Sequence, residues 1–313
     1  MIEKNQRTAA ASERGFVIVA VLWILAALSA LVMIFSVYLS NSAQALAVND
    51  TGLRSEALVS ASLELTAYQL ALAGDSARPL QGSFHFRLGD ADVFVSFVSE
   101  AARIDLNAAP KELLAGLLSG LGADQEDAKQ YADRIVGWRT PPKPDSADDG
   151  ASLYRAAGLA YSPRQAPFAH VNELALVVGL PPALVDRALP FVTVFSRLPK
   201  VNALVAPPEV IAALPGMTPS GLKEFLRAQP TLPADMAAIA TALGPAQANA
   251  TIEKSDSFRV LTTVKFDNGR RTSSEVVIGL GGEEDPYRVL SWQDEVEPVA
   301  SRPRKLAGED DEI

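Results

Sequence analysis

The feature that most limits what this chain can be is an uncharged apolar run at residues 16–39. It reads FVIVAVLWILAALSALVMIFSVYL, and only Ser29 and Ser36 interrupt it. A helix of this length covers the roughly 30 Å of hydrocarbon in a bilayer. We therefore expect this segment to span or anchor in a membrane.

The charges around this run predict its orientation. Three basic residues precede it, at Lys4, Arg7 and Arg14, whereas the first base after it is Arg54. Cytoplasmic flanks of membrane helices carry the excess of basic residues. The expected protein is therefore single-pass, with its amino terminus in the cytoplasm and its main body outside.

The junction before the run is unlike that of an ordinary signal peptide, whose short apolar region ends in a small-residue cleavage motif. Here Glu13, Arg14 and Gly15 stand immediately before Phe16. This order resembles a class III leader, which prepilin peptidase cuts between the glycine and the phenylalanine. The resemblance implies a leader at 1–15 and an N-methylated Phe16 in the mature chain. An uncleaved signal anchor is the alternative.

The fifth position after that junction departs from the common pilin pattern. Most pilins carry a glutamate there, whereas this chain has Ala20. A buried acid is costly without a partner, such as the amino terminus of a neighbouring subunit. Its absence predicts a subunit that lacks one of the usual filament neighbours, as a subunit at the filament tip would.

Composition narrows the function classes. The chain has 28 basic and 37 acidic residues, a net charge of -9, which disfavours binding to nucleic acid. It has no cysteine, and its two histidines, His85 and His170, are far apart, so neither a thiolate metal site nor a histidine ligand pair is expected. No nucleophile elbow or phosphate loop occurs. We predict that the protein is not an enzyme.

Beyond the membrane segment, the apolar spacing predicts that the helix continues to about Gly74. Proline-broken and glycine-broken helical segments fill the stretch from Ile104 to about Ala250. Strand patterns lie on both sides of that stretch, at 83–88, 92–99, 257–266, 272–280 and 287–292. The expected fold is α+β, with a long helix packed on one antiparallel sheet that an inserted helical domain splits in sequence.

This organisation sets the predicted boundaries. They are a leader at 1–15, the transmembrane part of the helix at 16–39, a pilin-like α+β domain at 40–100 and 251–296, an inserted helical domain at 101–250, and a disordered acidic tail at 297–313.

Two stretches of the helical domain resemble each other: 104–117 and 201–217. Each has an asparagine, Asn107 or Asn202, ahead of Ala-Pro, followed by a glutamate and an apolar run. A third stretch, 171–180, has a related form. These segments resemble helix-hairpin-helix motifs, which bind duplex phosphates in DNA-repair and competence proteins. Few bases surround them here, so we favour a packing role.

Together, the leader, Ala20, the split sheet and the hairpin repeats resemble the minor pseudopilin K family of type II secretion. That resemblance implies an inner-membrane protein whose main body is periplasmic, helping initiate or limit pseudopilus assembly at the tip. It also implies the I- and J-type minor pseudopilins, other pseudopilins and prepilin peptidase as partners. The alternative is a membrane-anchored, DNA-binding helix-hairpin-helix protein of a competence or type IV pilus system.

Some K-type proteins bind calcium through an acidic loop after the first hairpin. The corresponding loop here contains Asp145, Asp148 and Asp149, and calcium prefers such oxygen ligands. The family usually has Glu-Asp after Gly-Ala, whereas this chain has Ser152 and Leu153. We therefore favour a solvated acidic loop, with these aspartates as the candidate ligands if calcium is bound.

Overall fold

The computed structural model describes residues 6–141, 150–281, 285–294 and 296. Asp145, Asp148 and Asp149, the candidate calcium ligands, and the predicted tail at 297–313 lie outside these ranges. The chain divides into two compact units, Met1–Leu58 and Val59–Ile313, which are described separately.

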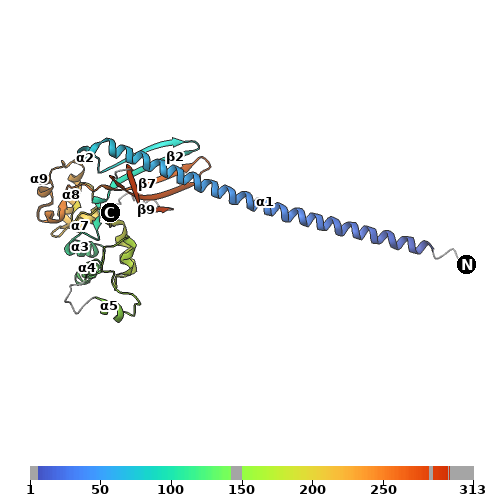
Figure 1. Ribbon diagram of the computed structural model, residues 1–313, viewed down its shortest axis with the longest axis horizontal. Coiled ribbons are helices and arrows are strands. Elements are labelled where there is room, and N and C mark those ends of the chain that lie inside the picture. Colours follow the sequence, from blue (N-terminus) through green and yellow to red (C-terminus); the bar gives the residue numbers. More distant parts are fainter. Residues whose placement is uncertain (1–5, 142–149, 282–284, 295, 297–313) are drawn as a thin grey trace, which may run out of the picture. The chain divides into compact units, whose positions relative to one another are not determined.

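The first unit consists of most of helix α1 (Gln6–Leu72), a continuous helix in Figure 1. Its segment Phe16–Ser40 is long and apolar enough to cross a membrane, with a mean hydropathy of 2.9. The large apolar side chains of this segment are exposed, Phe16 by 76%. An exposed apolar surface of this length is unfavourable in water and favourable in lipid.

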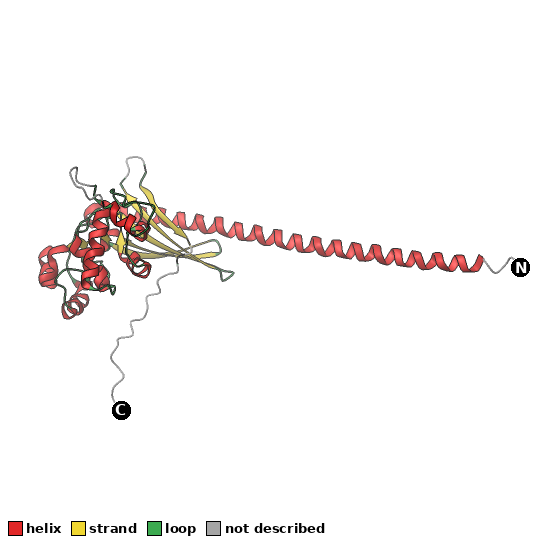
Figure 2. Ribbon diagram, turned by 90° about the horizontal axis from the view of Figure 1, so that it is seen from below, coloured by secondary structure: helices red, strands yellow, loops and turns green. Residues whose placement is uncertain are grey.

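The second unit begins with the last turns of α1, which Figures 1 and 2 both place beside the strands. Residues at helical spacing are buried there, namely Val59, Leu63, Ala67 and Leu70. On a more exposed side, the Tyr287 hydroxyl donates to Glu64 Oε1 over 3.1 Å. Burial together with this bond raises the pKa of Tyr287 to about 12. This end of α1 is therefore fixed to the sheet by an apolar stripe.

The sheet is antiparallel, in the order β1-β2-β7-β8-β9. Its strands are β1 (Gln81–Leu88), β2 (Ala91–Ser99), β7 (Ser257–Phe266), β8 (Arg271–Leu280) and β9 (Tyr287–Asp294). The predicted β1–β2 hairpin is confirmed: it turns at Gly89, whose φ of 61° suits glycine. Strands β2 and β7 pair directly, Ser99 opposite Phe258, although the helical region separates them in sequence.

Short elements fill the helical region between β2 and β7. The α-helices are α3 (Lys111–Gly120), α4 (Gln125–Arg139), α5 (Ala151–Ala156), α6 (Pro182–Ala188), α7 (Pro208–Ala212), α8 (Pro219–Ala228) and α9 (Met236–Leu243). The 3-10 helices are η1 (Glu100–Ala102), η2 (Val171–Leu176), η3 (Leu189–Phe191), η4 (Gln229–Thr231) and η5 (Gly244–Asn249). The described part of the region also has two parallel strand pairs: β3 (Ile104–Asp105) with β4 (Val192–Thr193), and β5 (Val201–Asn202) with β6 (Ala250–Thr251).

The expected α+β fold is confirmed, with two local differences. Helix α1 ends at Leu72, and a four-residue helix, α2 (Gly74–Ala77), follows where the sequence indicates no helix before Pro79. The parallel pairs β3–β4 and β5–β6 were not predicted, because two residues carry no recognisable strand pattern.

Candidate functional site

The first hairpin repeat consists of β3, α3 and α4 with β4. The Leu106 amide donates to the Thr193 carbonyl over 2.8 Å, which extends the β3–β4 pair. Asp105 then forms the turn: its Oδ1 accepts the Asn107 amide at 2.8 Å, and its carbonyl accepts the Ala109 amide at 2.8 Å. This side-chain turn directs the chain into α3 without a helical start before Pro110.

The second hairpin repeat, β5, α7 and α8 with β6, has the same backbone pattern. The Ala203 amide donates to the Thr251 carbonyl over 3.0 Å. Asn202 Oδ1 accepts the Leu204 amide at 3.1 Å, and its carbonyl accepts the Ala206 amide at 3.0 Å. Asn202 therefore occupies in this repeat the position that Asp105 occupies in the first.

This equivalence corrects the sequence-based match of Asn107 with Asn202. The turn requires a side-chain oxygen two residues before the bonded amide, and Asp105 supplies it. Asn107 has another role: its amide group donates to the Phe168 carbonyl at 3.0 Å and accepts the Phe168 amide at 2.7 Å. The related stretch at 171–180 also differs, because its first helix is the 3-10 helix η2.

In each repeat, the end of the second helix reaches back to the loop before the first helix. Arg139, the last residue of α4, donates to the carbonyls of Leu106 and Ala109, the latter over 2.7 Å. Gln229, which follows α8, donates to the carbonyls of Ala203 and Ala206 over 2.8 and 3.0 Å. The two pairs of carbonyls are equivalent. Sequence reasoning missed these two donors because an arginine and a glutamine share no motif.

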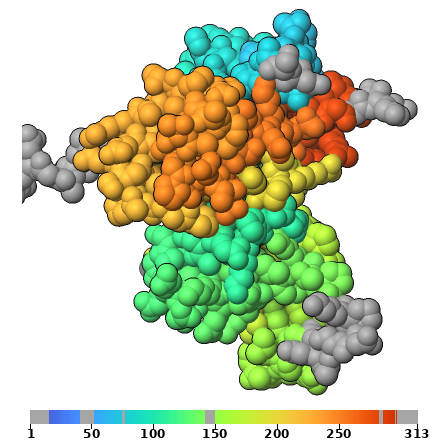
Figure 3. Space-filling model, turned by 90° about the vertical axis from the view of Figure 1, so that its left-hand side faces the viewer, coloured from blue at the N-terminus to red at the C-terminus, as the bar shows by residue number. Residues whose placement is uncertain are grey.

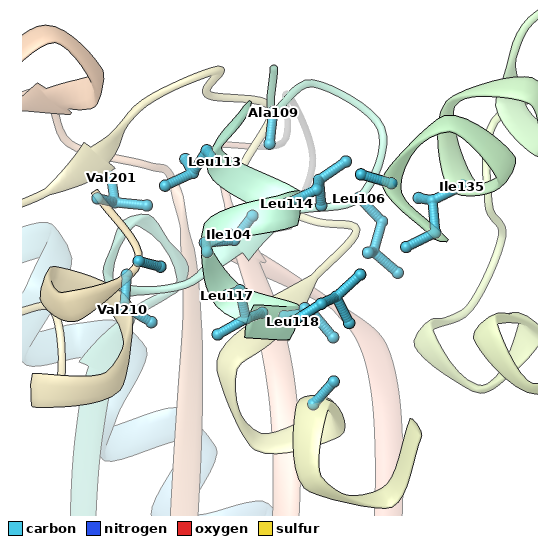
Figure 4. Packing of buried hydrophobic residues seen from close by; sticks show 14 of the residues in the cluster. Ile104, Leu106, Ala109, Leu113, Leu114, Leu117, Leu118, Ile135, Val201 and Val210 are labelled. Carbon is cyan, nitrogen blue, oxygen red and sulfur yellow. The ribbon is translucent and has the colours of Figure 1, made fainter. Parts of the chain in front are cut away.

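The two hairpins meet along α3 and α7. Figure 4 shows Leu113 and Leu117 of α3 pointing toward the side of the second hairpin, and Leu118 toward the side of α4. These side chains belong to one buried cluster that continues through both repeats. At the closest approach, a Cβ added to Gly116 would lie 2.1 Å from the Ala213 carbonyl oxygen. Only glycine allows this contact between the helices.

Between the hairpins runs an open groove of roughly 600 Å³, lined by α3, the start of α4 and residues 212–216. Figure 3 shows the two repeats as neighbouring masses, the first in green and the second in yellow to orange. The two lysines that line the groove are paired with acids, Lys111 with Asp133 at 2.6 Å and Lys129 with Glu126 at 2.7 Å. The groove therefore offers little positive charge that could attract phosphate.

The hairpin turns are also poor phosphate sites. At the first turn, the Gly122 amide donates to the Ser119 carbonyl at 2.9 Å and the Ala123 amide to Leu118 at 3.0 Å. At the second, the Met217 amide donates to the Leu214 carbonyl at 3.0 Å. Amides that are bonded internally cannot also bind a phosphate oxygen without losing a bond. The geometry thus disfavours the nucleic-acid alternative and fits a packing role.

The helical region joins the sheet at Glu100, the first residue after β2, whose side chain is fully buried. Arg259 of β7 donates to both carboxylate oxygens, over 2.8 and 3.2 Å, and the Thr193 hydroxyl of β4 donates to Oε2. Burial alone would raise the pKa of Glu100. The charge and bonds of Arg259, with Arg103 and Thr193, outweigh that effect and lower the pKa below its usual range.

Asp105, five residues further on, is buried with a weaker set of partners. Its Oδ2 accepts the Ser196 hydroxyl at 3.0 Å and the Arg197 amide at 2.8 Å. None of these donors is charged, and Arg139 donates elsewhere. Burial therefore raises the pKa of Asp105, although these hydrogen bonds oppose the rise.

Comparison with known proteins finds a similarity in this part of the chain. Residues 95–197 match the family described as type II secretion system (T2SS), protein K. The matched segment, called the protein K domain below, is similar to that family. It contains β3, the first hairpin and β4, and it ends before the second hairpin repeat begins at Val201.

A solved structure has the same fold beyond the protein K domain. It is a chain of the GspK–GspI–GspJ complex from the enterotoxigenic Escherichia coli type 2 secretion system, with a TM-score of 0.59. The match covers 80% of this chain and 98% of that chain, at 15% sequence identity. No curated protein sequence matches this chain.

Three other residues singled out in the sequence fall outside residues 95–197. Gly15, Phe16 and Ala20 all belong to α1, and the Gly15–Phe16 junction lies within the helix. Their predicted roles in processing and assembly stay predictions. Among the described residues, no group of three or more His, Cys, Asp or Glu side chains could hold a metal ion.

The two histidines have ordinary surroundings. His85 of β1 stacks on Phe94 of β2, with ring centroids 6.1 Å apart. His170 Nδ1 accepts the Asn172 amide at 3.2 Å at the start of η2. Each imidazole therefore has a local contact that accounts for its place in the fold.

Proposed function

We propose that this chain is a minor pseudopilin of the type II secretion system. In this role it sits at the pseudopilus tip with I- and J-type minor pseudopilins and helps initiate or limit assembly for export of folded proteins from the periplasm. The observation that carries the proposal is the similarity of residues 95–197 to T2SS protein K, because most of that segment is inserted between β2 and β7. The similar fold in the GspK–GspI–GspJ complex supports it.

The insertion gives the tip position a physical reason. The chain leaves the sheet after Ser99 and returns at Ser257, and the paired residues Ser99 and Phe258 place both crossings at one end of the sheet. The helical region is attached at that end. Its volume would obstruct another subunit stacking there, since packed protein interiors do not compress to make room.

The proposed membrane topology is a single inner-membrane span with the main body in the periplasm. Its support is the exposed apolar segment Phe16–Ser40 together with the basic leader. In this topology prepilin peptidase removes residues 1–15 and Phe16 is methylated. Mass spectrometry after co-expression with an active peptidase should find a chain that begins at N-methylated Phe16. An intact Met1 terminus would contradict this processing.

The surface proposed for partner subunits is on the last turns of α1. Leu65, Tyr68 and Leu72 are 40%, 64% and 73% exposed there. Apolar side chains that recur at helical spacing on an exposed face suit packing against another helix. We expect the I- and J-type partners to bury this face.

Co-purification of the full chain with I- and J-type pseudopilins tests this surface. Tyr68→Glu should reduce recovery of the partners, because a charge would be buried in an apolar contact. Leu153→Glu is the matched control, since Leu153 is 52% exposed but lies on α5. Equal recovery with Tyr68→Glu and the parent would remove this face from the proposal.

The protein K domain belongs to a structural component of a secretion machine, and we propose no catalytic role. For the acidic loop, we propose that the carboxylates are solvated and do not bind calcium. Calcium should then leave the melting temperature of the full chain unchanged. A rise that disappears in the triple variant Asp145→Asn, Asp148→Asn, Asp149→Asn would instead establish those aspartates as ligands.

A further inference from the structure

The helical region and the sheet are joined by two chain crossings, one through η1 and one through the segment between β6 and β7. Two crossings alone leave the angle between the two parts weakly defined, because short loops can rotate. The side chains at the first crossing therefore decide how rigid the junction is.

Glu100 makes bonds to both parts through one carboxylate. From the sheet, Arg259 of β7 donates to it over 2.8 and 3.2 Å. From the helical region, the Thr193 hydroxyl of β4 donates to the same carboxylate. Because Thr193 is also the residue whose carbonyl extends the β3–β4 pair, the carboxylate is connected directly to the base of the first hairpin repeat.

The surrounding charges are balanced and largely shielded from water. Arg259 also donates to Glu275 of β8. Arg103 lies 3.4 Å from Glu100 and donates from Nε to the Pro190 carbonyl, over 3.0 Å. The side chains of Arg259, Arg103 and Glu275 are 14%, 16% and 22% exposed, whereas that of Glu100 is 0% exposed. Charged hydrogen bonds in such a setting are stronger and more directional than those at the surface.

A second, weaker link lies at the other crossing. Arg78, just before β1, pairs with Asp256 at 2.9 Å; the Arg78 side chain is 11% exposed, but that of Asp256 is 79% exposed, so water reaches the pair. Solvent-exposed pairs contribute little rigidity. The first crossing, with its fully buried carboxylate, is therefore the stronger determinant of the angle.

We propose that the Glu100–Arg259–Thr193 network is a clamp that fixes the orientation of the helical region on the sheet, and that the tip subunit needs this fixed orientation. The first half depends only on the contacts above. The second half rests on the proposed function, and a separate readout tests it.

The chain contains no cysteine, so pairs of spin labels can be introduced without removing any native residue. We would label Ser83→Cys on β1 and Gln130→Cys on α4, both exposed, in the full chain in detergent micelles. Pulsed electron paramagnetic resonance then measures the distribution of distances between the sheet and the helical region. The parent should give one narrow distribution.

Glu100→Gln keeps the size of the side chain but removes the charge that both arginines face. It should broaden the distribution by at least about two-fold, because the two buried guanidinium groups lose the charged carboxylate that they share and draw water into the junction. The matched control is Asp92→Asn, which removes an exposed pair with Arg87 (3.1 Å) on the same sheet. It should leave the width unchanged. An unchanged width in a folded Glu100→Gln protein overturns the clamp.

Should Glu100→Gln not fold, Thr193→Val replaces it, because it removes the hydroxyl that donates to Glu100 and leaves both guanidinium groups paired. The same hydroxyl accepts the Phe195 amide at 3.1 Å, and that bond is lost as well. We expect a smaller broadening and a normal circular dichroism spectrum. A folded Thr193→Val protein with the parent width would then overturn the clamp.

A secretion assay in cells tests the functional half. Glu100→Gln should still insert in the membrane and be processed, but secretion should fall. A broadened distribution with normal secretion would overturn the requirement for a fixed orientation while leaving the clamp in place. If the parent protein failed to co-purify with I- and J-type pseudopilins, that result would instead count against the proposed function itself.

Discussion

The first and second hairpin repeats have the same backbone pattern but hold it with different side chains. Asp105 and Asn202 make the same turn, one as a carboxylate and the other as an amide. Arg139 and Gln229 cap equivalent carbonyls, although one is charged and the other neutral. The comparison teaches that the fold requires donors and acceptors at fixed places, and that different residue types can supply them.

The repeats also differ in size and in what each turn residue does next. Helices α3 and α4 have 10 and 15 residues, whereas α7 and α8 have 5 and 10. Asn202 donates its amide to the Glu253 carbonyl over 2.8 Å, a bond that a carboxylate cannot make. Asp105 instead accepts from Ser196 and Arg197. The turn residue of each repeat thus matches the hydrogen-bonding groups of the segment packed against it: donors face Asp105, and a carbonyl acceptor faces Asn202.

The largest expected effect comes from the contact between the repeats. Gly116→Ala should destabilise the full chain by about 3 kcal/mol, because the new methyl group would overlap the Ala213 carbonyl and force the helices apart. Chemical denaturation in detergent measures the change. Gly137→Ala in α4 is the control: nothing lies within 4 Å of its added Cβ, so a gain of about 0.5–1 kcal/mol is expected. Equal effects at both glycines would contradict the close packing of α3 on α7.

The next effect tests the equivalence of Arg139 and Gln229. Arg139→Leu leaves two carbonyls without their donor and should cost about 2 kcal/mol. Arg139→Gln should recover part of that loss, because Gln229 performs the same task in the second repeat. Denaturation midpoints of the two variants provide the measurement. If glutamine proves no better than leucine, the cap of the first repeat depends on the charge or the length of arginine.

A pH series separates the two buried carboxylates. The pKa of Asp105 is raised in the folded state, so the folded chain binds the Asp105 proton more tightly than the unfolded chain does. The contribution of this group to stability therefore falls as the pH rises above the ordinary aspartate value of 3.8. The pKa of Glu100 is lowered, so its contribution is complete above 4.5 and is lost as pH falls through the folded value. We would measure the free energy of unfolding against pH for the parent, Asp105→Asn and Glu100→Gln. The difference between the parent and each variant should change with pH, with opposite signs for the two variants. Slopes of the same sign would contradict one of the two pKa shifts.

The smallest expected effect concerns the starts of the second helices. Thr218 Oγ1 accepts the Gly221 amide at 3.1 Å at the start of α8, whereas Asp124 makes no side-chain cap bond at the start of α4. Thr218→Ala should cost about 1 kcal/mol and Asp124→Ala less than that. Thermal melting of both variants checks the order, and a larger loss for Asp124→Ala would reverse this part of the comparison.

Several parts of the fold follow from local sequence patterns. The apolar run from Phe16 could only suit a membrane or a deep core, and strand alternation with a Gly89 turn identified the first hairpin of the sheet. The repeat was also visible, but its register was wrong at Asn107. A turn residue is defined by the backbone amide to which its side chain bonds. The sequence has two polar residues close together, Asp105 and Asn107, and does not show which of them makes that bond.

The sequence by itself determined the long apolar helix, the α+β class and the presence of two hairpins, because each depends on periodicity or on turn chemistry within a few residues. Only the tertiary structure decided that Glu100 meets Arg259 and Thr193, and that Arg139 and Gln229 are equivalent caps. Those contacts join residues far apart in the chain. Their partners are chosen by how the elements pack, and no local pattern records that choice.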